Sequence, residues 1–256
     1  MRIVDLSVAI ENSVPADPPG LEPEIDYLDH DAGAADLTAR FTGLERAQLP
    51  DGKGWAIERL RVTTHNGTHM DAPWHYHPTM DHGVRAATID EIPLEWCMQP
   101  GMRLDFRELP DGHVVSADEL EAEFDRIGRR PAPLEIVVCN TAAGERYGEA
   151  DYIDRGCGFG REATLALLSH GVRVVGTDGW SWDAPFSATA RRFARDRDPA
   201  IIWEGHKAGR ERGYCQLEKL HHLELLPDQG FTIVCFPVAI RSASAAWARV
   251  VALVDE

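Results

Sequence analysis

The sequence predicts an α/β fold with a mixed β-sheet. Seven short segments rich in Val, Ile and aromatic residues have strand character, and four segments have helical periodicity. The strands outnumber the helices and do not alternate with them regularly, which argues against a doubly wound nucleotide-binding sheet. With 256 residues, of which 44% are apolar and 27% are charged, the chain can bury a sizeable core.

The predicted strands are short and rich in β-branched and aromatic residues. The run Phe231–Ile240 is the longest apolar one, yet it is about half the length needed to cross a bilayer, so we interpret it as a buried strand. In chain order, the expected strands are Arg2–Leu6, Trp55–Thr64, Met102–Phe106, Leu134–Asn140, Val172–Asp178, Phe231–Ile240 and Trp247–Val254.

The clearest predicted helix runs from Ser116 to Ile127. Its first residues, S-A-D-E, supply an N-cap hydroxyl and a glutamate at the third helical position, and Gly128 follows its last residue. Three further helices are expected over residues 160–170, 187–195 and 215–226.

We expect a single domain over residues 1–256, because no repeat, low-complexity tract or interdomain linker interrupts the chain. Residues 11–54 are rich in Pro, Gly and Asp. This composition predicts an N-terminal arm or a long loop.

The charge of the chain limits its partners. It has 42 acidic and 26 basic residues, a net charge of −16, and no basic stripe, so neither nucleic acid nor a membrane surface is an expected partner.

The first residues lack the features of a secretory signal, which predicts a cytoplasmic location. The five cysteines are scattered without a C-x-x-C pair, and we expect them to be reduced.

Residues 65–75 read H-N-G-T-H-M-D-A-P-W-H and contain three histidines and one aspartate. A glycine and a proline within this segment, and the β-like run before it, favour an extended chain over a helix. Side chains of an extended chain alternate between two sides, so His65, His69, Asp71 and His75 can project to the same side.

Two imidazoles and a carboxylate form a suitable ligand set for Zn²⁺, Mn²⁺ or Fe²⁺, and the absence of thiolate favours a catalytic site over a structural zinc site. The plain alternative is a surface loop with exposed histidines. Another alternative is a non-haem iron oxygenase, because His69, Asp71 and the distant His206 imitate a two-histidine, one-carboxylate triad. A third is a metal-binding protein without activity.

The histidine-rich segment resembles the H-x-G-T-H-x-D-x-P-x-H signature of the cyclase family, which includes bacterial kynurenine formamidase and isatin hydrolase. The resemblance continues through Asp5-Leu6-Ser7, through G-T-D-G-W-S-W-D at residues 176–183, and through His206 and Glu218. It implies the swivelling β/β/α fold with a mixed sheet and a metal-dependent amide hydrolase.

The resemblance also implies roles for individual residues. His65, His69 and Asp71 would bind one metal ion, and Asp71 would share a second ion with His206 and Glu218 in two-metal members. His75 matches the acid/base histidine of the family. The long region before Trp55 and the W-S-W-D segment look more like isatin hydrolase, whose members work with one manganese. The expected cofactor is therefore Mn²⁺ or Zn²⁺, as one or two ions.

The expected substrate is a small aromatic amide. The favoured reaction opens a cyclic amide such as isatin with metal-activated water, while His75 moves the proton. The alternative is an arylformamidase that converts N-formylkynurenine to kynurenine and formate in tryptophan catabolism. The resemblance further implies a homodimer or homotetramer, in which the N-terminal arm reaches a neighbouring pocket. Aromatic residues near the two motifs are the expected substrate contacts: Trp74, Tyr76, Trp180, Trp182 and Phe186.

Overall fold

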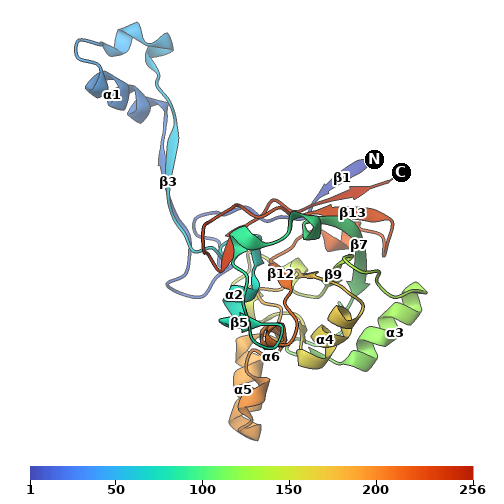
Figure 1. Ribbon diagram of the computed structural model, residues 1–256. Helices are drawn as coiled ribbons and strands as arrows, with labels where there is room; N and C mark the ends of the chain where they lie inside the picture. The colour runs from blue at the N-terminus through green and yellow to red at the C-terminus, as the bar shows by residue number, and fades with distance from the viewer. Residues whose placement is uncertain (256) are drawn as a thin grey trace.

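A nine-stranded mixed sheet organises residues 1–255, which are described by a computed structural model (Figure 1). The strands β7, β9, β11 and β12 pair in parallel, and the remaining pairings are antiparallel. The predicted α/β class with a mixed sheet is thus confirmed. In spatial order the strands are β1 (Arg2–Asp5), β15 (Val251–Val254), β13 (Phe231–Val234), β7 (Met98–Asp105), β9 (Ile136–Asn140), β11 (Val174–Thr177), β12 (Cys215–Glu218), β4 (His69–Asp71) and β14 (Ala245–Trp247).

The central strand β9 supplies side chains to two separate hydrophobic cores. Ile136 and Val138 belong to one core, whereas Val137 and Cys139 belong to the other. Helices α3 (Ala117–Ile127) and α4 (Arg161–Ser169) contribute to the second core and cover that face of the sheet (Figure 1). Because both faces are covered, β9 is apolar without alternation, as is usual for parallel strands.

Helix α3 has the predicted boundaries. Its N-cap Ser116 accepts a hydrogen bond from the Glu119 backbone N–H at 3.2 Å, and the Glu119 carboxylate accepts one from the Ser116 N–H at 2.8 Å. Gly128 ends the helix with a φ of +85°, a conformation that glycine adopts without strain. The other helices are α1 (His30–Arg40), α2 (Pro73–Tyr76), α5 (Phe186–Asp196) and α6 (Glu204–Lys207).

The helix predicted over residues 215–226 is wrong. Strand β12 occupies its first four residues, and a 3₁₀ turn at Leu223–Leu225 follows. All four side chains of β12 are buried between β11 and β4. A short segment adopts strand geometry when neighbouring strands offer hydrogen bonds, whatever its helical spacing suggests.

The extended conformation predicted for residues 65–75 is correct only at its centre. Strand β4 covers His69–Asp71, but His65 lies in a turn before it, and His75 lies on the short helix α2. Pro73 is the first residue of α2, a position where its fixed φ and missing N–H suit a helix. The side chains of this segment therefore meet because the chain bends.

Residues 24–61, which we call the arm, extend away from the sheet (Figure 1). Strands β2 (Glu24–Leu28) and β3 (Ile57–Arg61) form its antiparallel ribbon, and helix α1 lies at the far end.

None of the helices within residues 1–255 combines the length and the apolarity needed to cross a bilayer. Two more strand pairs are β5 (Thr79–Met80) with β6 (Val84–Arg85), and β8 (Val114–Val115) with β10 (Gly158–Phe159).

Candidate metal centre

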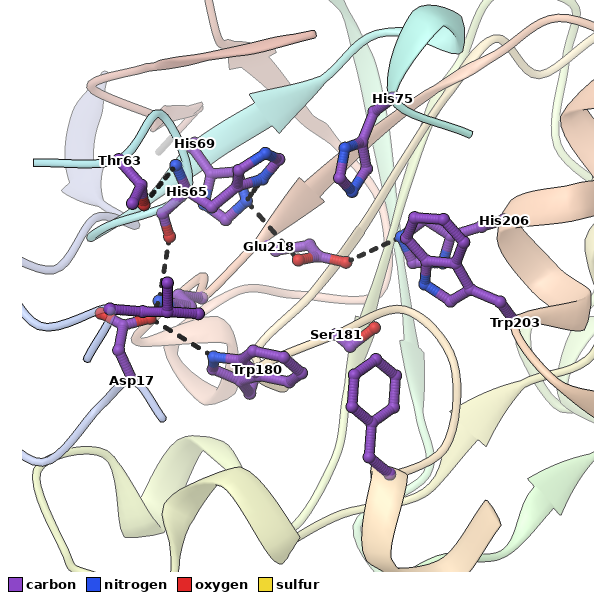
Figure 2. A pocket seen from close by; sticks show the side chains of 13 residues that line it. Asp17, Thr63, His65, His69, His75, Trp180, Ser181, Trp203, His206 and Glu218 are labelled. Carbon is purple, nitrogen blue, oxygen red and sulfur yellow. Dashed lines mark hydrogen bonds and ion pairs between the residues drawn. The ribbon is translucent and has the colours of Figure 1, made fainter. Parts of the chain in front are cut away.

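Strands β4 and β12 and helices α2 and α6 meet at a cavity of about 270 Å³. The register of β4 with β12 sets Glu218 directly opposite His69. Figure 2 shows His65, His69 and His75 on one side of the cavity, Trp180 on the opposite side, and Glu218 between them. The cavity is lined by Asp17, Leu21, Thr63, His65, His69, His75, Trp180, Ser181, Phe186, Trp203, His206, Glu218 and Lys219.

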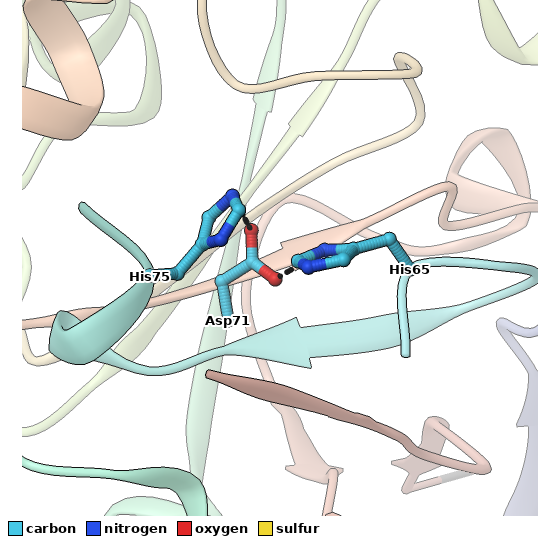
Figure 3. Close-up of side chains that lie close together, drawn as sticks. All are labelled: His65, Asp71 and His75. Carbon is cyan, nitrogen blue, oxygen red and sulfur yellow. Dashed lines mark ion pairs between the residues drawn. The ribbon is translucent and has the colours of Figure 1, made fainter. Parts of the chain in front are cut away.

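The Asp71 carboxylate lies at the centre of this cluster. It is fully buried, and neither of its oxygens accepts a hydrogen bond from the described residues. His65 Nδ1 lies 3.0 Å from Oδ1, and His75 Nε2 lies 3.8 Å from Oδ2 (Figure 3). A buried carboxylate without donors is costly unless it is a ligand, so these two oxygens fit a cation.

Hydrogen bonds orient the imidazoles of His69 and His206. Nδ1 of His69 donates to the Gly67 carbonyl at 2.9 Å, and Nδ1 of His206 donates to Asp183 Oδ2 at 2.5 Å. Each Nε2 therefore keeps its lone pair, and these atoms lie 3.5 Å and 3.6 Å from the two oxygens of Glu218. Hydrogen bonds of this kind are typical of metal-binding histidines.

The ligand atoms form two overlapping groups that share Asp71. The first contains His65 and His75, and the second contains His69 and Glu218, with the ligand atoms of each group within 4.8 Å of one another. His206 Nε2 lies 3.9 Å from Asp71 Oδ2. This nitrogen and oxygen donor set, with no thiolate, suits Zn²⁺ or Mn²⁺.

Burial and charge act in opposite directions on these groups. Burial favours a neutral Asp71, but the imidazoles of His75, His65 and His69 outweigh it and hold the pKa of Asp71 well below its usual range. For His65, burial is outweighed by the Asp71 carboxylate, which raises its pKa. Burial lowers the pKa of His75 to about 4. Burial lowers the pKa of His206, but the hydrogen bond that its imidazole donates to Asp183 and the charge of that carboxylate outweigh burial and raise this pKa.

Only two of the five aromatic residues predicted as substrate contacts line the cavity, Trp180 and Phe186. Trp182 is fully buried, stacks on Phe159 at 4.2 Å, and donates its indole N–H to Thr164 at 2.9 Å. It is a core residue.

The other two predicted contacts also lie outside the cavity lining. Trp74 is 40% exposed on the outer side of α2. Tyr76 is buried behind the cluster, with its ring edge against His206 at 5.2 Å. Successive side chains of a helix such as α2 point in different directions, so Trp74 and Tyr76 do not share the side of His75.

Among the residues of the site that were not predicted from the sequence are Asp183, Trp203 and Lys219. Asp183 ends the W-S-W-D segment, and Trp203 stacks on His206 with ring centroids 4.5 Å apart. The spacing of three residues between Trp203 and His206 offers a weak sequence signal for this contact.

Lys219 is buried at the cavity wall. Its ammonium donates to the Asp17 carboxylate and to the His65 carbonyl, the latter at 3.0 Å. Asp17 also accepts a hydrogen bond from the Trp180 indole at 3.3 Å. Burial lowers the pKa of Lys219, although Asp17 opposes this effect. Nothing in the sequence around Asp17 indicates this long-range pair.

The sequence matches the Cyclase family ("Putative cyclase") over residues 4–184, which is more than half of the chain. The protein belongs to the cyclase family. The matched residues include the histidine-rich segment at residues 65–75.

Curated relatives of this cyclase-family protein include two kynurenine formamidases. That of Paracidovorax citrulli (strain AAC00-1) is 25% identical over 195 residues, which make up 76% of this chain and 78% of the relative. That of Salinibacter ruber (strain DSM 13855 / M31) is 28% identical over 193 residues, or 75% of this chain and 77% of the relative.

Solved structures with the same fold include isatin hydrolases. One, bound to the product analogue thioisatinate, has a TM-score of 0.76 and 20% identity, and the match covers 99% of this chain and 92% of the other. Isatin hydrolase A from Ralstonia solanacearum has a TM-score of 0.75 and 24% identity with the same coverage. The mixed-sheet fold of the cyclase family is thus confirmed.

Proposed function

We propose that this cyclase-family protein is a metal-dependent hydrolase of aryl amides that opens a cyclic amide such as isatin. The observation that carries the proposal is the buried Asp71 carboxylate, which accepts no hydrogen bond from the described residues and is surrounded by imidazole nitrogens at the wall of a cavity. His65, His69 and Asp71 would hold one divalent ion, Mn²⁺ or Zn²⁺, and His206 with Glu218 would complete a second position beside Asp71. When bound, such an ion supplies Lewis-acid chemistry by lowering the pKa of water and polarising a carbonyl group.

The hydrolysis itself needs one proton to move. Water adds to the amide carbonyl carbon, the C–N bond breaks, and the leaving nitrogen takes up one proton of the water, which yields an aryl amine and a carboxylic acid. The acid then releases its proton to the solvent and becomes a carboxylate. The His75 imidazole lines the cavity, and it can take the proton from water and return it to the nitrogen. Trp180 and Phe186 give an aromatic ring two flat apolar surfaces to pack against, and these contact each other with ring centroids 5.3 Å apart.

Charge favours an uncharged substrate over N-formylkynurenine. Of the cavity-lining residues in the described part of the chain, Lys219 alone is a lysine or arginine, and its ammonium is already paired with Asp17. N-formylkynurenine carries a free carboxylate and an ammonium group, and each needs a partner of opposite charge or several hydrogen bonds when it is buried. Isatin has no ionised group, so it enters such a cavity without that cost.

The second candidate is an arylformamidase. Two kynurenine formamidases share 25% and 28% identity with this chain over about three quarters of its length, which supports a formamide substrate. Both reactions use the same attack of water on an aryl amide, so the difference between them lies in how the substrate is bound.

Steady-state kinetics on isatin and N-formylkynurenine, with one metal and one buffer, tests the ranking. We expect the higher kcat/KM for isatin. A preference for the formamide of tenfold or more, which corresponds to about 1.4 kcal/mol of transition-state binding, would reverse it. Absence of turnover of both compounds by the metal-loaded protein would contradict the proposed substrate class.

Metal dependence is tested separately from turnover. The His69→Ala variant should lose bound Mn²⁺ or Zn²⁺ in elemental analysis, because the remaining ligands do not complete the coordination of the ion. The matched control is His222→Ala, which removes an exposed imidazole outside the cluster and should keep the metal. Full metal content in the His69 variant would exclude this residue as a ligand.

A further inference from the structure

The Asp17 carboxylate and the Lys219 ammonium form an ion pair at one end of the cavity. Both residues line the cavity, and Figure 2 shows Asp17 on the opposite side from Trp203 and His206. The Asp17 side chain is 8% exposed and that of Lys219 is 1% exposed. Burial of a charge is costly without a partner of opposite charge, so each of these two groups depends on the other.

Three donors from distant parts of the chain converge on the Asp17 carboxylate. The Lys219 ammonium and the Trp180 indole N–H donate to Oδ1, the latter at 3.3 Å, and the Asn66 amide donates to Oδ2 at 2.9 Å. Both oxygens of Asp17 thus have partners, whereas those of Asp71 have none among the described residues. Asp17 is therefore not a further metal ligand, and its role lies in the cavity wall.

The Lys219 ammonium has Asp17 as its nearest carboxylate. It also donates to the His65 carbonyl at 3.0 Å, but that oxygen carries no net charge. The carboxylates of Glu218 and Asp71 attract the ammonium from a greater distance, and both are assigned to the metal ion. Asp17 is thus the carboxylate that neutralises Lys219 at the cavity wall.

Asp17 also fixes the part of the wall that an aromatic ring contacts. Ala16, the residue before it, is buried in a small core against which Trp180 packs. Asn66 donates a second hydrogen bond to the Leu21 carbonyl at 2.7 Å, and Leu21 lines the cavity. The same contacts that pair the charges therefore hold residues 16–21 and the Trp180 ring in place.

We propose that Asp17 is a specificity-determining residue that makes the cavity select uncharged aromatic substrates. Its carboxylate occupies the ammonium that a substrate carboxylate needs as a partner. The inference rests on the proposed hydrolase function and adds to it the residue that enforces the charge preference. In Asp17→Asn the Lys219 charge is left uncompensated at the cavity wall. The carboxylate of a ligand then takes the place of Asp17 beside that ammonium.

Two ligands that differ only in charge test the proposal. They are ortho-aminobenzoylpropionate, which ends in a carboxylate, and the corresponding propionamide. Both carry the same ring and ketone, so the ratio of their dissociation constants isolates the carboxylate. In calorimetry of the full chain with Mn²⁺, the wild type should bind the amide more tightly than the acid. In Asp17→Asn this ratio should shift towards the acid by at least about tenfold.

Two further variants show where a shift in the ratio comes from. The double variant Asp17→Asn with Lys219→Met lacks the ammonium, so it should lose the gain in acid affinity. The matched control is Glu11→Gln, which removes an exposed carboxylate of the N-terminal region that does not line the cavity. This control should keep the wild-type ratio, because the loss of one distant negative charge has little effect on a buried pair.

Three results would overturn the inference. They are a wild type that binds the acid as tightly as the amide, a ratio in Asp17→Asn equal to that in Glu11→Gln, and a gain in acid affinity that survives in the double variant. The first result needs no variant, so it decides the question even where Asp17→Asn fails to fold. Failure of the wild type to bind either ligand would contradict the proposed substrate class itself, and this inference with it.

Discussion

The buried Asp178 carboxyl makes the stability of the protein depend on pH. It lies after β11 and accepts hydrogen bonds from the backbone N–H and the hydroxyl of Thr141, the latter at 2.6 Å. Burial outweighs these bonds and raises the pKa of Asp178 from 3.8 to about 7. The folded chain therefore binds this proton more tightly than the unfolded chain does.

The direction in which stability changes with pH follows from this difference between the folded and the unfolded chain. Stability from the protonated Asp178 is fully present below pH 3.8 and is lost as the pH rises towards about 7. The difference between the two pKa values corresponds to about 4 kcal/mol of unfolding free energy. Because Asp178→Asn removes the titrating group, the variant should gain up to this amount relative to the wild type between pH 4 and pH 7.5.

Urea unfolding of both proteins in chelator, at intervals of half a pH unit across that window, measures the effect. The difference in unfolding free energy between variant and wild type isolates Asp178, since the other groups titrate in both. The control is Asp118→Asn, which removes an exposed carboxyl from α3. A difference for Asp178→Asn that does not change across the pH window would refute the reasoning.

Three further predictions concern the metal centre and its walls. His75→Ala should keep its bound metal while kcat falls roughly 10²- to 10⁴-fold, the usual contribution of an acid/base group; elemental analysis that shows metal loss would make His75 a ligand instead. Asp183→Asn should weaken metal binding about 10- to 100-fold in calorimetry, because it disturbs the group that orients His206, and unchanged affinity would show that this contact is not needed. Trp182→Ala should lower the unfolding free energy by about 3–5 kcal/mol, as for a buried aromatic side chain, whereas Trp203→Ala should mainly raise KM for isatin. Denaturant titration and kinetics on both variants check this contrast, and the reverse pattern would contradict the assignment of Trp203 to the cavity wall.

Local sequence rules predicted the elements whose causes are local. The capping box at Ser116 and the glycine at position 128 determine where α3 begins and ends, since each acts on backbone within a few residues. The segment Leu134–Asn140, rich in Val and Ile, likewise predicted the strand that forms β9. The histidine-rich segment identified a candidate metal centre because its ligand atoms come from one stretch of chain.

What the sequence determined by itself was thus the α/β class, the well-capped helix and the presence of a metal-ligand motif. Only the tertiary structure decided that 215–218 is a strand, because that choice depends on hydrogen bonds to β11 and β4. It also decided which aromatic side chains reach the cavity, since the turn of α2 directs Trp74 outward. The pairs Asp183 with His206 and Asp17 with Lys219 join residues distant along the chain, and local patterns carry no information about such contacts.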